Sequence, residues 1–483
     1  MTLSEDPEPI VAAAAAAHRA WSRAPRATRA AALTAVARAL DDAGDELVEV
    51  ARAETNLAEA RLRGELLRTT FQLRLFADVL LDGGYLDVRV DHADPQWPMG
   101  PRPDLRRTSQ AIGPVIVYAA SNFPFAFSVA GGDTASALAA GASVIVKAHA
   151  GHPELSRRTA RVVVEALRAA GAPDGLFALV ETRETGIAIL RDPRVKAGSF
   201  TGSIPGGRAL FDIASSRPDP IPFFGELGSV NPVFVTGAAD RARGATIAGE
   251  LLGSVTLGSG QFCTKPGVVL VPRDGALLAA LREAALPDGQ PMLNDRIQAG
   301  YAETLHELAG HPDVEVLAQG SDPFGAAPSP TVLLTSLDAL LAKQEELFRE
   351  CFGPTVLVAA YDLEADLVRF ARAIDGQLTA TLVAEEGDGI VPGLVDELRE
   401  KAGRLLWNQW PTGVSVTFAQ QHGGPYPATT APGTTSVGTA AIDRFLRPVA
   451  FQGFPEALLP DELAEAPATG LVRRVDGAVE TRG

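Results

Sequence analysis

Two cysteines are the only thiols in this 483-residue chain, and one of them has the surroundings of a nucleophile. Cys263 follows the segment GSGQF (residues 258–262), whose glycines allow the backbone to approach a sulfur closely. Backbone N–H groups in such a turn can stabilise a thiolate or an oxyanion. Cys351 stands directly before an expected strand, where a free cysteine is often buried as a small hydrophobe. Cys263 is therefore the candidate nucleophile, and Cys351 is interpreted as a packing residue.

Three further polar residues could assist such a nucleophile, although each has a plain structural alternative. Asn122 lies in ASNFPF (residues 120–125), where its amide could bind an oxyanion or form a turn before Phe-Pro. Glu226 follows an apolar run and could act as a base or simply end an edge strand. Lys147 ends another apolar run and could bind an anion or be solvated. The residue types alone leave these alternatives open.

Composition excludes several classes of protein. The chain has 43 Lys and Arg against 59 Asp and Glu, and a net charge of −16 argues against binding nucleic acid or anionic lipid. Two cysteines exclude a disulfide scaffold and fit a reducing cytosol. Residues 1–10 lack the basic and apolar segments of a secretory signal. Residues 111–146 carry Asp133 as their only charge, but their prolines and glycines predict a β-α-β unit rather than a membrane span. We therefore expect a cytoplasmic protein.

The elements that must position these residues follow an α/β pattern. The first 80 residues are helical in composition, and short apolar runs then alternate with helical segments. Strands are expected at Gly113–Ala119 and Ser143–Lys147, with a helix at Phe127–Ala140 between them. Alternation of this kind predicts parallel sheets with helices on both faces, and ligands at the carboxyl ends of the strands.

The pattern divides the chain into two open parallel-sheet α/β domains and a small β element. The first domain is predicted to comprise residues 1–90 and 112–227, and the second residues 228–430. Residues 91–111 and 431–483 are predicted to supply a hairpin and a C-terminal segment outside these domains. The last dozen residues, from Leu471, are polar and are expected to fray.

Five motifs, in order and over nearly the whole chain, resemble those of aldehyde dehydrogenases. They comprise an Asn-Phe-Pro turn, a pyrophosphate turn, a glutamate motif, a cysteine motif and a Glu-x-Phe-Gly-Pro motif, found at residues 120–125, 200–207, 226–232, 260–263 and 350–354. Any one of these motifs is weak evidence. Their order and spacing together leave little room for coincidence, and they imply an aldehyde dehydrogenase-like fold.

Four further segments resemble a narrower branch, the α-ketoglutaric semialdehyde dehydrogenases: residues 128–141, 147–149, 422–430 and 435–445. This branch oxidises 2,5-dioxopentanoate to 2-oxoglutarate, and it also contains NADP-dependent fatty aldehyde dehydrogenases. The resemblance therefore implies a semialdehyde substrate, with a medium- or long-chain aldehyde as the alternative.

The family resemblance implies a role for each catalytic residue. Cys263 attacks the aldehyde carbon, and the Asn122 amide and the Cys263 backbone N–H hold the resulting oxyanion. A hydride then leaves for the nicotinamide, and Glu226 activates water against the thioester. A cofactor-independent cysteine esterase and a catalytically silent relative are the competing classes. A papain-like hydrolase would need a partner histidine, and none of the seven histidines has a context that identifies it as one.

The resemblance also assigns residues to the cofactor. Glu350 would meet the nicotinamide ribose and Lys147 the adenosine ribose; Phe352 shares the Glu350 motif, and the pyrophosphate would lie at Gly202, Ser203 and Gly207. NAD-preferring relatives often carry a glutamate three residues after the lysine, where this chain has Ala150. With His149, His152 and Arg157 close in sequence, we predict that NADP is accepted and preferred, and that NAD can also serve.

The substrate side and the assembly are predicted only by analogy. Phe123 and Phe127 are expected to face the aldehyde, and Phe418 to close its path, although all three could be ordinary core residues. A distal carboxylate would need an arginine that one sequence does not identify. No metal site is predicted. The resemblance implies a homodimer or homotetramer assembled through residues 91–107 and 444–452, whose strand edges would pair with a partner subunit.

Overall fold

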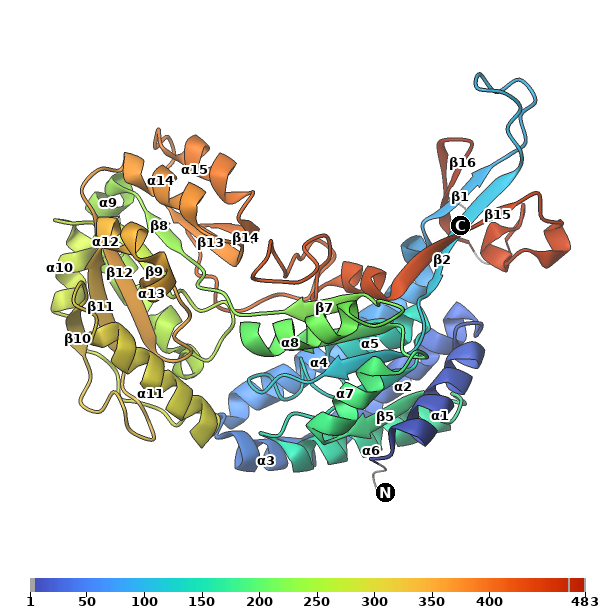
Figure 1. The fold of residues 1–483 in the computed structure, drawn as a ribbon, viewed down its shortest axis with the longest axis horizontal. Coiled ribbons are helices and arrows are strands. Elements are labelled where there is room, and N and C mark those ends of the chain that lie inside the picture. Colours follow the sequence, from blue (N-terminus) through green and yellow to red (C-terminus); the bar gives the residue numbers. More distant parts are fainter. Residues whose placement is uncertain (1–4, 468–469, 482–483) are drawn as a thin grey trace.

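The computed structural model describes residues 5–467 and 470–481, and it is built around three sheets (Figure 1). The first is a five-stranded sheet in the order β5-β4-β3-β6-β7, in which every neighbouring pair is parallel. Its strands are β3 (Val115–Tyr118), β4 (Val144–Lys147), β5 (Phe177–Val180), β6 (Ala197–Thr201) and β7 (Phe223–Glu226). Right-handed crossovers of this kind bring the loops after the strands to one edge of the sheet.

Alternate residues of the central strand β3 serve two different cores. Val115 and Val117 belong to the core under α2, α4, α5 and α6, whereas Ile116 and Tyr118 pack with α1, α7 and α8. A strand that is buried on both faces must be apolar throughout, as this one is. The helices are α1 (Pro7–Trp21), α2 (Arg26–Asp42), α3 (Gly44–Thr55), α4 (Glu59–Asp82), α5 (Gly132–Ala140), α6 (Pro153–Ala169), α7 (Arg183–Arg191) and α8 (Ile204–Ser215).

The second sheet has seven strands in the order β10-β11-β12-β9-β8-β13-β14, and only the β10–β11 pair is antiparallel. Its strands are β8 (Val233–Val235), β9 (Val268–Pro272), β10 (Glu315–Gln319), β11 (Thr331–Ser336), β12 (Thr355–Tyr361), β13 (Gln377–Val383) and β14 (Ala402–Trp407). Its helices are α9 (Gly237–Thr256), α10 (Ala276–Arg282), α11 (Asp295–Ala309), α12 (Leu337–Ala342), α13 (Gln344–Leu347), α14 (Ala365–Ala373) and α15 (Val391–Leu398). They cover both faces and form a separate core on each.

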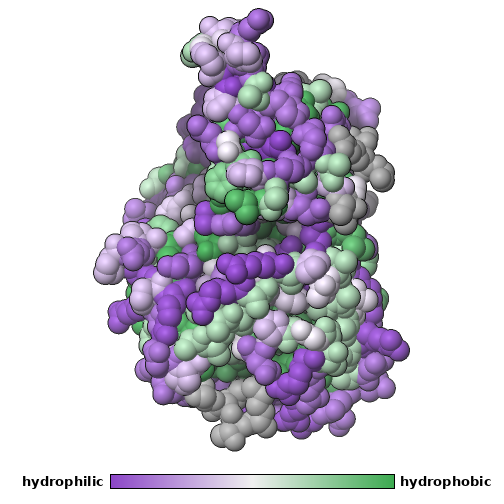
Figure 2. Space-filling view, turned by 90° about the vertical axis from the view of Figure 1, so that its right-hand side faces the viewer, coloured by the Kyte–Doolittle hydropathy of each residue, from purple (hydrophilic) through white to green (hydrophobic). Residues whose placement is uncertain are grey.

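The third sheet is small and projects from the body as an arm (Figure 1). Its order is β15-β2-β1-β16-β17, with β2 antiparallel to both of its neighbours. The strands are β1 (Val88–Asp91), β2 (Leu105–Ala111), β15 (Leu446–Gln452), β16 (Val472–Val475) and β17 (Ala478–Thr481). Short 3₁₀ turns, among them η2 (Leu257–Gly260) and η3 (Thr439–Phe445), complete the fold. Polar residues cover most of the face that carries the arm, and apolar residues gather in limited patches (Figure 2).

The expected β-α-β unit at residues 111–146 is present as β3, α5 and β4, but its helix begins later than predicted. The sequence predicts a helix from Phe127, whereas α5 begins at Gly132. The preceding segment folds into turns because the buried carboxylate of Glu65, on α4, accepts hydrogen bonds from the backbone N–H groups of Phe125 (2.8 Å) and Ala126 (3.0 Å). A contact across the fold thus overrides the local helical preference. No helix among the described residues is both long enough and apolar enough to cross a bilayer.

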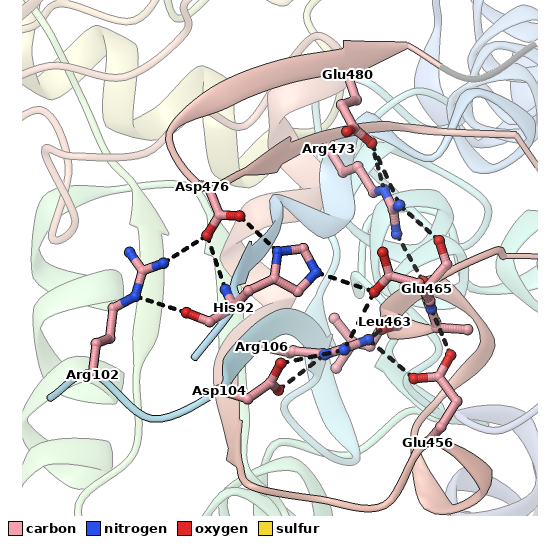
Figure 3. Close-up of polar contacts among 11 residues, drawn as sticks. His92, Arg102, Asp104, Arg106, Glu456, Leu463, Glu465, Arg473, Asp476 and Glu480 are labelled. Carbon is pink, nitrogen blue, oxygen red and sulfur yellow. Dashed lines mark hydrogen bonds and ion pairs between the residues drawn. The ribbon is translucent and has the colours of Figure 1, made fainter. Parts of the chain in front are cut away.

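The prediction that the chain frays from Leu471 is wrong over the described residues. Val472–Val475 pairs in parallel with β1 and Ala478–Thr481 pairs with β16, so this segment completes the small sheet. Ionic contacts attach it to the hairpin of β1 and β2 (Figure 3): the Asp476 carboxylate contacts His92 Nδ1 at 2.6 Å and accepts a hydrogen bond from Arg102 at 2.7 Å. The polar composition that suggested fraying supplies these contacts.

Replacing His92 should loosen the C-terminal strands. Asp476 and Glu465 raise the pKa of His92, and His92 in turn lowers the pKa values of both carboxylates. The attraction is therefore complete below the ordinary pKa of histidine while the carboxylates are ionised, and it is lost as the pH rises through the raised pKa. We expect His92→Gln to speed amide hydrogen exchange in residues 472–481 roughly two- to five-fold at pH 6, because exposed pairs contribute little individually. In the wild-type protein, exchange in this segment should also accelerate at high pH after correction for the intrinsic pH dependence of exchange. If it did not, the role of His92 would be contradicted.

Candidate active site

Cys263 lies in a tight turn between the end of α9 and the start of β9. Gly258, Ser259 and Gly260 all have positive φ, between 55° and 67°. A side chain at position 260 would meet the carbonyl oxygen of Gly353 at 2.1 Å, so only glycine fits there. Asn231 donates a hydrogen bond to the Cys263 carbonyl at 2.8 Å. The glutamate, cysteine and Glu-x-Phe-Gly-Pro motifs, remote in sequence, are thereby held together.

Asn122 lies next to the cysteine turn, as the sequence predicts. Its side-chain amide donates to the Gln261 backbone carbonyl at 3.1 Å, and the backbone carbonyl of Asn122 accepts a hydrogen bond from Arg61 at 2.7 Å. The residue is buried, and its amide nitrogen carries a second hydrogen. The position therefore suits an oxyanion donor on the Cys263 side.

Glu226 ends β7 and is buried. Its backbone carbonyl accepts from Gly202, and Leu227 donates to Ala428, so the chain is fixed on both sides. Its Oε2 is buried with no hydrogen-bond partner among the described residues. Burial, opposed by Arg444 and reinforced by Asp133, raises the pKa of Glu226 well above its ordinary value. A carboxyl group with a raised pKa and a free oxygen suits general-base work near neutral pH.

A histidine that sequence analysis did not select lies beside the thiol. His422 Nε2 is 3.8 Å from Cys263 Sγ, across 159 residues of sequence. Burial, together with Arg404, Arg68 and Arg444, lowers the pKa of His422 to about 3. The imidazole is therefore neutral at working pH and can accept a proton only transiently. The one signal in the sequence is that His422 opens the branch-like segment at residues 422–430.

The surroundings of Cys263 favour the thiol over the thiolate in the resting site. Burial, Glu350 and Glu226 raise its pKa to about 12, against the opposing effects of Arg68 and its own backbone N–H. The backbone groups that the sequence suggested as thiolate donors do not by themselves outweigh desolvation. A base must therefore remove the proton when substrate is bound, and Glu226 and His422 are the groups placed to do so.

The amino end of α8 has the form of a phosphate cradle. The Ser203 side chain caps the helix by accepting a hydrogen bond from the Gly206 N–H. Both Gly202 and Ser203 are exposed. A side chain at Gly207 would meet Leu227 at 2.1 Å, so the helix packs closely on the loop after β7. Free N–H groups and the helix dipole favour an anion here. The residues present therefore fit the pyrophosphate of a dinucleotide.

Of the two expected ribose-binding side chains, Glu350 lies near the start of α8, since a Cβ at Gly228 would meet both Glu350 and Ile204. The Glu350 carboxylate packs against Gly228, since a Cβ added to Gly228 would lie 2.5 Å from a Glu350 carboxylate oxygen. Burial raises the pKa of Glu350 to about 7, and Lys265 opposes the shift. Phe352 is half-buried in the same loop. Lys147 ends β4 and is half-buried, and burial lowers its pKa despite nearby carboxylates, of which Glu184 acts most strongly.

The structure corrects part of the argument for NADP. Arg157 is already engaged by Glu181, at 2.6 and 3.1 Å, and by Glu154. His152 is buried and contacts the carbonyl of Ala120 at 3.0 Å. Neither side chain is free to meet a 2′-phosphate. His149 accepts a hydrogen bond from the Gly151 N–H, and burial, His152, Lys147 and Arg296 lower its pKa to about 3, so it brings no positive charge to a 2′-phosphate either.

Two of the three predicted substrate aromatics lie at the thiol side. The rings of Phe123 and Phe127 are 5.3 Å apart, and Phe127 is 6.3 Å from the ring of His422. Phe418 is not part of this cluster: its side chain is 70% exposed. Val414 and Val416, from the same segment, pack there instead. Among the described residues no group of three or more His, Cys, Asp or Glu side chains could hold a metal ion.

Comparison with known proteins agrees with this geometry. A model described as the aldehyde dehydrogenase family matches residues 2–426. The chain is 45% identical over 472 residues to α-ketoglutaric semialdehyde dehydrogenase 2 of Azospirillum brasilense, covering 95% of this chain and 89% of the relative. It is 41% identical over 478 residues to the α-ketoglutaric semialdehyde dehydrogenase of Acinetobacter baylyi (strain ATCC 33305 / BD413 / ADP1), covering 97% and 90%.

Solved structures share the fold at low sequence identity. A 3,6-anhydro-L-galactose dehydrogenase superposes with a TM-score of 0.77 at 22% identity, covering 92% of this chain and 91% of the other. An NADP-dependent glyceraldehyde-3-phosphate dehydrogenase of Bacillus halodurans C-125, complexed with NADP, gives 0.76 at 21%, with 92% and 91% covered. The family match, the two relatives and the placement of Cys263, Asn122 and Glu226 lead to one conclusion: the chain belongs to the aldehyde dehydrogenase family and is an NAD(P)-dependent aldehyde dehydrogenase.

Proposed function

We propose that this enzyme oxidises 2,5-dioxopentanoate, the α-ketoglutaric semialdehyde, to 2-oxoglutarate. The observation that carries the proposal is near-full-length identity of 41% and 45% to two enzymes named for that substrate. The site supports it, because the positive charge of Arg68 lowers the pKa values of both Cys263 and its neighbour His422. An anionic aldehyde would meet positive charge there, which the overall net charge of −16 does not supply.

In this proposal Cys263 is the nucleophile. Its sulfur forms a bond to the aldehyde carbon, and the carbonyl oxygen becomes an oxyanion held by the Asn122 amide and the Cys263 backbone N–H. The thiol proton would pass to the ionised form of Glu226, which must release it to solvent before its second task, or to the neutral His422, whose Nε2 is 3.8 Å from the sulfur. These groups thus generate the thiolate only when substrate is present to accept it.

Lys147, Gly202, Ser203, Gly207, Glu350 and Phe352 would hold the cofactor. When bound, the nicotinamide accepts the hydride that leaves the substrate carbon. We further propose that NADP is preferred and NAD tolerated, because Ala150 stands where NAD-preferring relatives carry a glutamate. Lys147 supports the proposal, whereas Glu181 and Glu184, which affect the pKa of Lys147, oppose it.

Glu226 has the second chemical task. Its carboxylate would take a proton from the water that attacks the thioester carbon, which breaks the carbon–sulfur bond and restores Cys263. The group must be ionised to act as a base. Because its folded-state pKa is raised, turnover should rise as the pH increases through that raised value.

We expect Glu226→Gln to lower kcat roughly 100- to 10,000-fold, the usual contribution of a general base, and to remove this rise with pH. His422→Gln should keep the rise, because His422 is neutral throughout the range. Steady-state kcat from pH 5.5 to 9 checks both expectations, with Cys263→Ala as the inactive control that still binds NADP. If the rise persisted in Glu226→Gln, the titration would belong to Glu350, whose pKa is near 7, and the assignment would be wrong.

A panel of aldehydes tests the proposed substrate and cofactor together. Purified wild-type enzyme is assayed with 2,5-dioxopentanoate, 5-oxopentanoate, hexanal and decanal, each with NAD and with NADP. We expect the highest kcat/KM with 2,5-dioxopentanoate and NADP. A higher value with decanal would favour the fatty aldehyde alternative, and a much higher value with NAD than with NADP would overturn the cofactor preference. Ester hydrolysis without oxidation in either cofactor would favour the esterase alternative.

We also propose that the small sheet assembles the enzyme into a dimer or tetramer, and that the enzyme is cytoplasmic. β15 is an edge strand whose other side pairs with no described strand, and exposed edges of this kind invite pairing with another chain. Multi-angle light scattering should give a mass of two or four chains. A monomer at micromolar concentration would refute the assembly.

A further inference from the structure

One face of α4 brings two arginines and a glutamate to the cysteine turn. Arg61, Glu65 and Arg68 lie at spacings of four and three residues, so they share a side of the helix. Arg61 already has defined partners: it donates to the Asn122 carbonyl at 2.7 Å and lies over the Phe262 ring, 4.6 Å from its centre. It is a positioning residue for the oxyanion donor rather than a free cation.

Arg68 has no such partner. Its guanidinium makes no hydrogen bond and no ion pair with any described residue, and its Nε is fully buried without an acceptor. Its side chain packs against aromatic faces: the guanidinium carbon is 5.2 Å from the Phe127 ring centre and 6.0 Å from that of Phe123. A buried guanidinium cannot lose its proton, so it remains a charged donor without an acceptor.

The neighbouring charges leave Arg68 incompletely neutralised. Glu65 uses one carboxylate oxygen to bind the backbone N–H groups of Phe125 and Ala126, and burial raises its pKa, which disfavours the negative form. Arg404, the other arginine whose charge interacts with Cys263, donates instead to the carbonyls of Pro411 and Gly413. Among the arginines that act on the thiol, Arg68 alone keeps its donors uncommitted within the described part of the chain.

Arg68 lies close to the reacting sulfur. Its charge lowers the pKa of Cys263 and that of His422. Contacts also connect the two groups: Arg68 lies over Phe127, Phe127 adjoins the His422 ring, and His422 Nε2 is 3.8 Å from Cys263 Sγ. Phe127 and Phe123 would line the short path between them with apolar rings.

We propose that Arg68 binds the carboxylate of the substrate, an inference that rests on the proposed function. The site would then take short aldehydes that end in a carboxylate. The guanidinium can hold the carboxylate through two parallel hydrogen bonds while the aldehyde at the other end reaches Cys263. The aromatic rings would pack against the carbons between them.

The same arrangement selects against neutral aldehydes. A fatty aldehyde would displace water from Arg68 and bring no acceptor, which leaves a desolvated charge unpaired. Sites built to satisfy a buried polar group discriminate strongly against analogues that lack its partner. Arg68 would therefore be the residue that separates semialdehydes from the fatty aldehydes of the same branch.

Matched substrates and variants test this inference. 2,5-Dioxopentanoate and 5-oxopentanoate are compared with methyl 5-oxopentanoate, a neutral ester of nearly the same shape, in wild type, Arg68→Gln and Arg68→Lys. We expect Arg68→Gln to lower kcat/KM for the two acids roughly 30- to 1,000-fold, mainly through KM, and to change the ester by less than about threefold. Arg68→Lys should recover part of the loss, because lysine keeps the positive charge but lacks the planar guanidinium that forms two parallel hydrogen bonds.

Arg74→Gln is the control for net charge. Arg74 lies on the same helix and pairs with Asp41 at the surface, so this variant should resemble wild type with every substrate. A second readout does not need turnover of the acid: 2-oxoglutarate should inhibit pentanal oxidation competitively, with a Ki that rises in Arg68→Gln in parallel with the KM of the acids.

Equal losses for the acids and the ester, or no loss for the acids, would overturn the role of Arg68. The ratio of acid to ester within each variant decides that question. The ranking of aldehydes by the wild-type enzyme decides the proposed substrate separately, so the two ideas can fail independently. Should Arg68→Gln prove unstable, Arg68→Lys and the inhibition by 2-oxoglutarate still carry the test.

Discussion

Desolvation of ionisable side chains around Cys263 is the constraint on which the chemistry of this enzyme depends. It raises the pKa values of the thiol, Glu226 and Glu350, and it lowers that of His422. Every one of these shifts favours the neutral form of the group, so in the resting site the thiol, the two carboxyl groups and the imidazole carry little charge. Burial also lowers the pKa values of Arg68 and Arg404, but a guanidinium still keeps its proton. The positive charges that remain are therefore the natural partners of an anionic substrate and of a developing oxyanion.

The two large sheets contribute to the site from opposite ends of their strands. In the five-stranded sheet the functional residues follow the strands: Lys147 ends β4, Gly202 follows β6 and Glu226 ends β7. In the seven-stranded sheet they precede them, since Cys263 comes before β9 and Glu350 before β12. The rule that ligands meet carboxyl ends of parallel strands thus describes only the first sheet. The segment between β7 and β8 joins the two edges, and Asn231 within it binds the Cys263 carbonyl directly.

Local pattern was sufficient to predict the alternation of strands and helices, because strands buried on both faces must be continuously apolar. It also indicated Cys263 as a candidate nucleophile, because its glycine-rich turn is a local feature, and the family resemblance implied its role. It did not reveal His422, because that histidine reaches the thiol across 159 residues and its own sequence context carries no catalytic signal. It could not distinguish Arg68 from the 42 other basic residues either. What sets Arg68 apart from the other arginines that act on the thiol is that none of its donors has an acceptor among the described residues, and that depends on how every surrounding segment is packed.

Tertiary contacts, which one sequence does not show, also explain the two expectations that the structure corrects. Arg157 was suggested for the cofactor by its nearness in sequence to Lys147, but a carboxylate from the end of the neighbouring strand engages it. The polar C-terminal residues were expected to fray, but their charges are complementary to those of the β1–β2 hairpin. In both cases a charge that looks solvated in one sequence finds a partner through tertiary contact. Composition predicts the presence of such charges and not their pairing.

The chain from His422 to β15 makes the active site and the small sheet parts of one continuous segment. His422 borders the thiol, Thr429 pairs with the backbone of Glu226, and Ser436 hydrogen-bonds the His422 carbonyl. The segment then enters η3, where buried Arg444 forms an ion pair with Asp133 at 2.5 Å, two residues before β15 begins. Both members of that pair act on the pKa of Glu226. The ion pair that adjoins the small sheet thus helps to set the charge environment of the residue proposed to activate water.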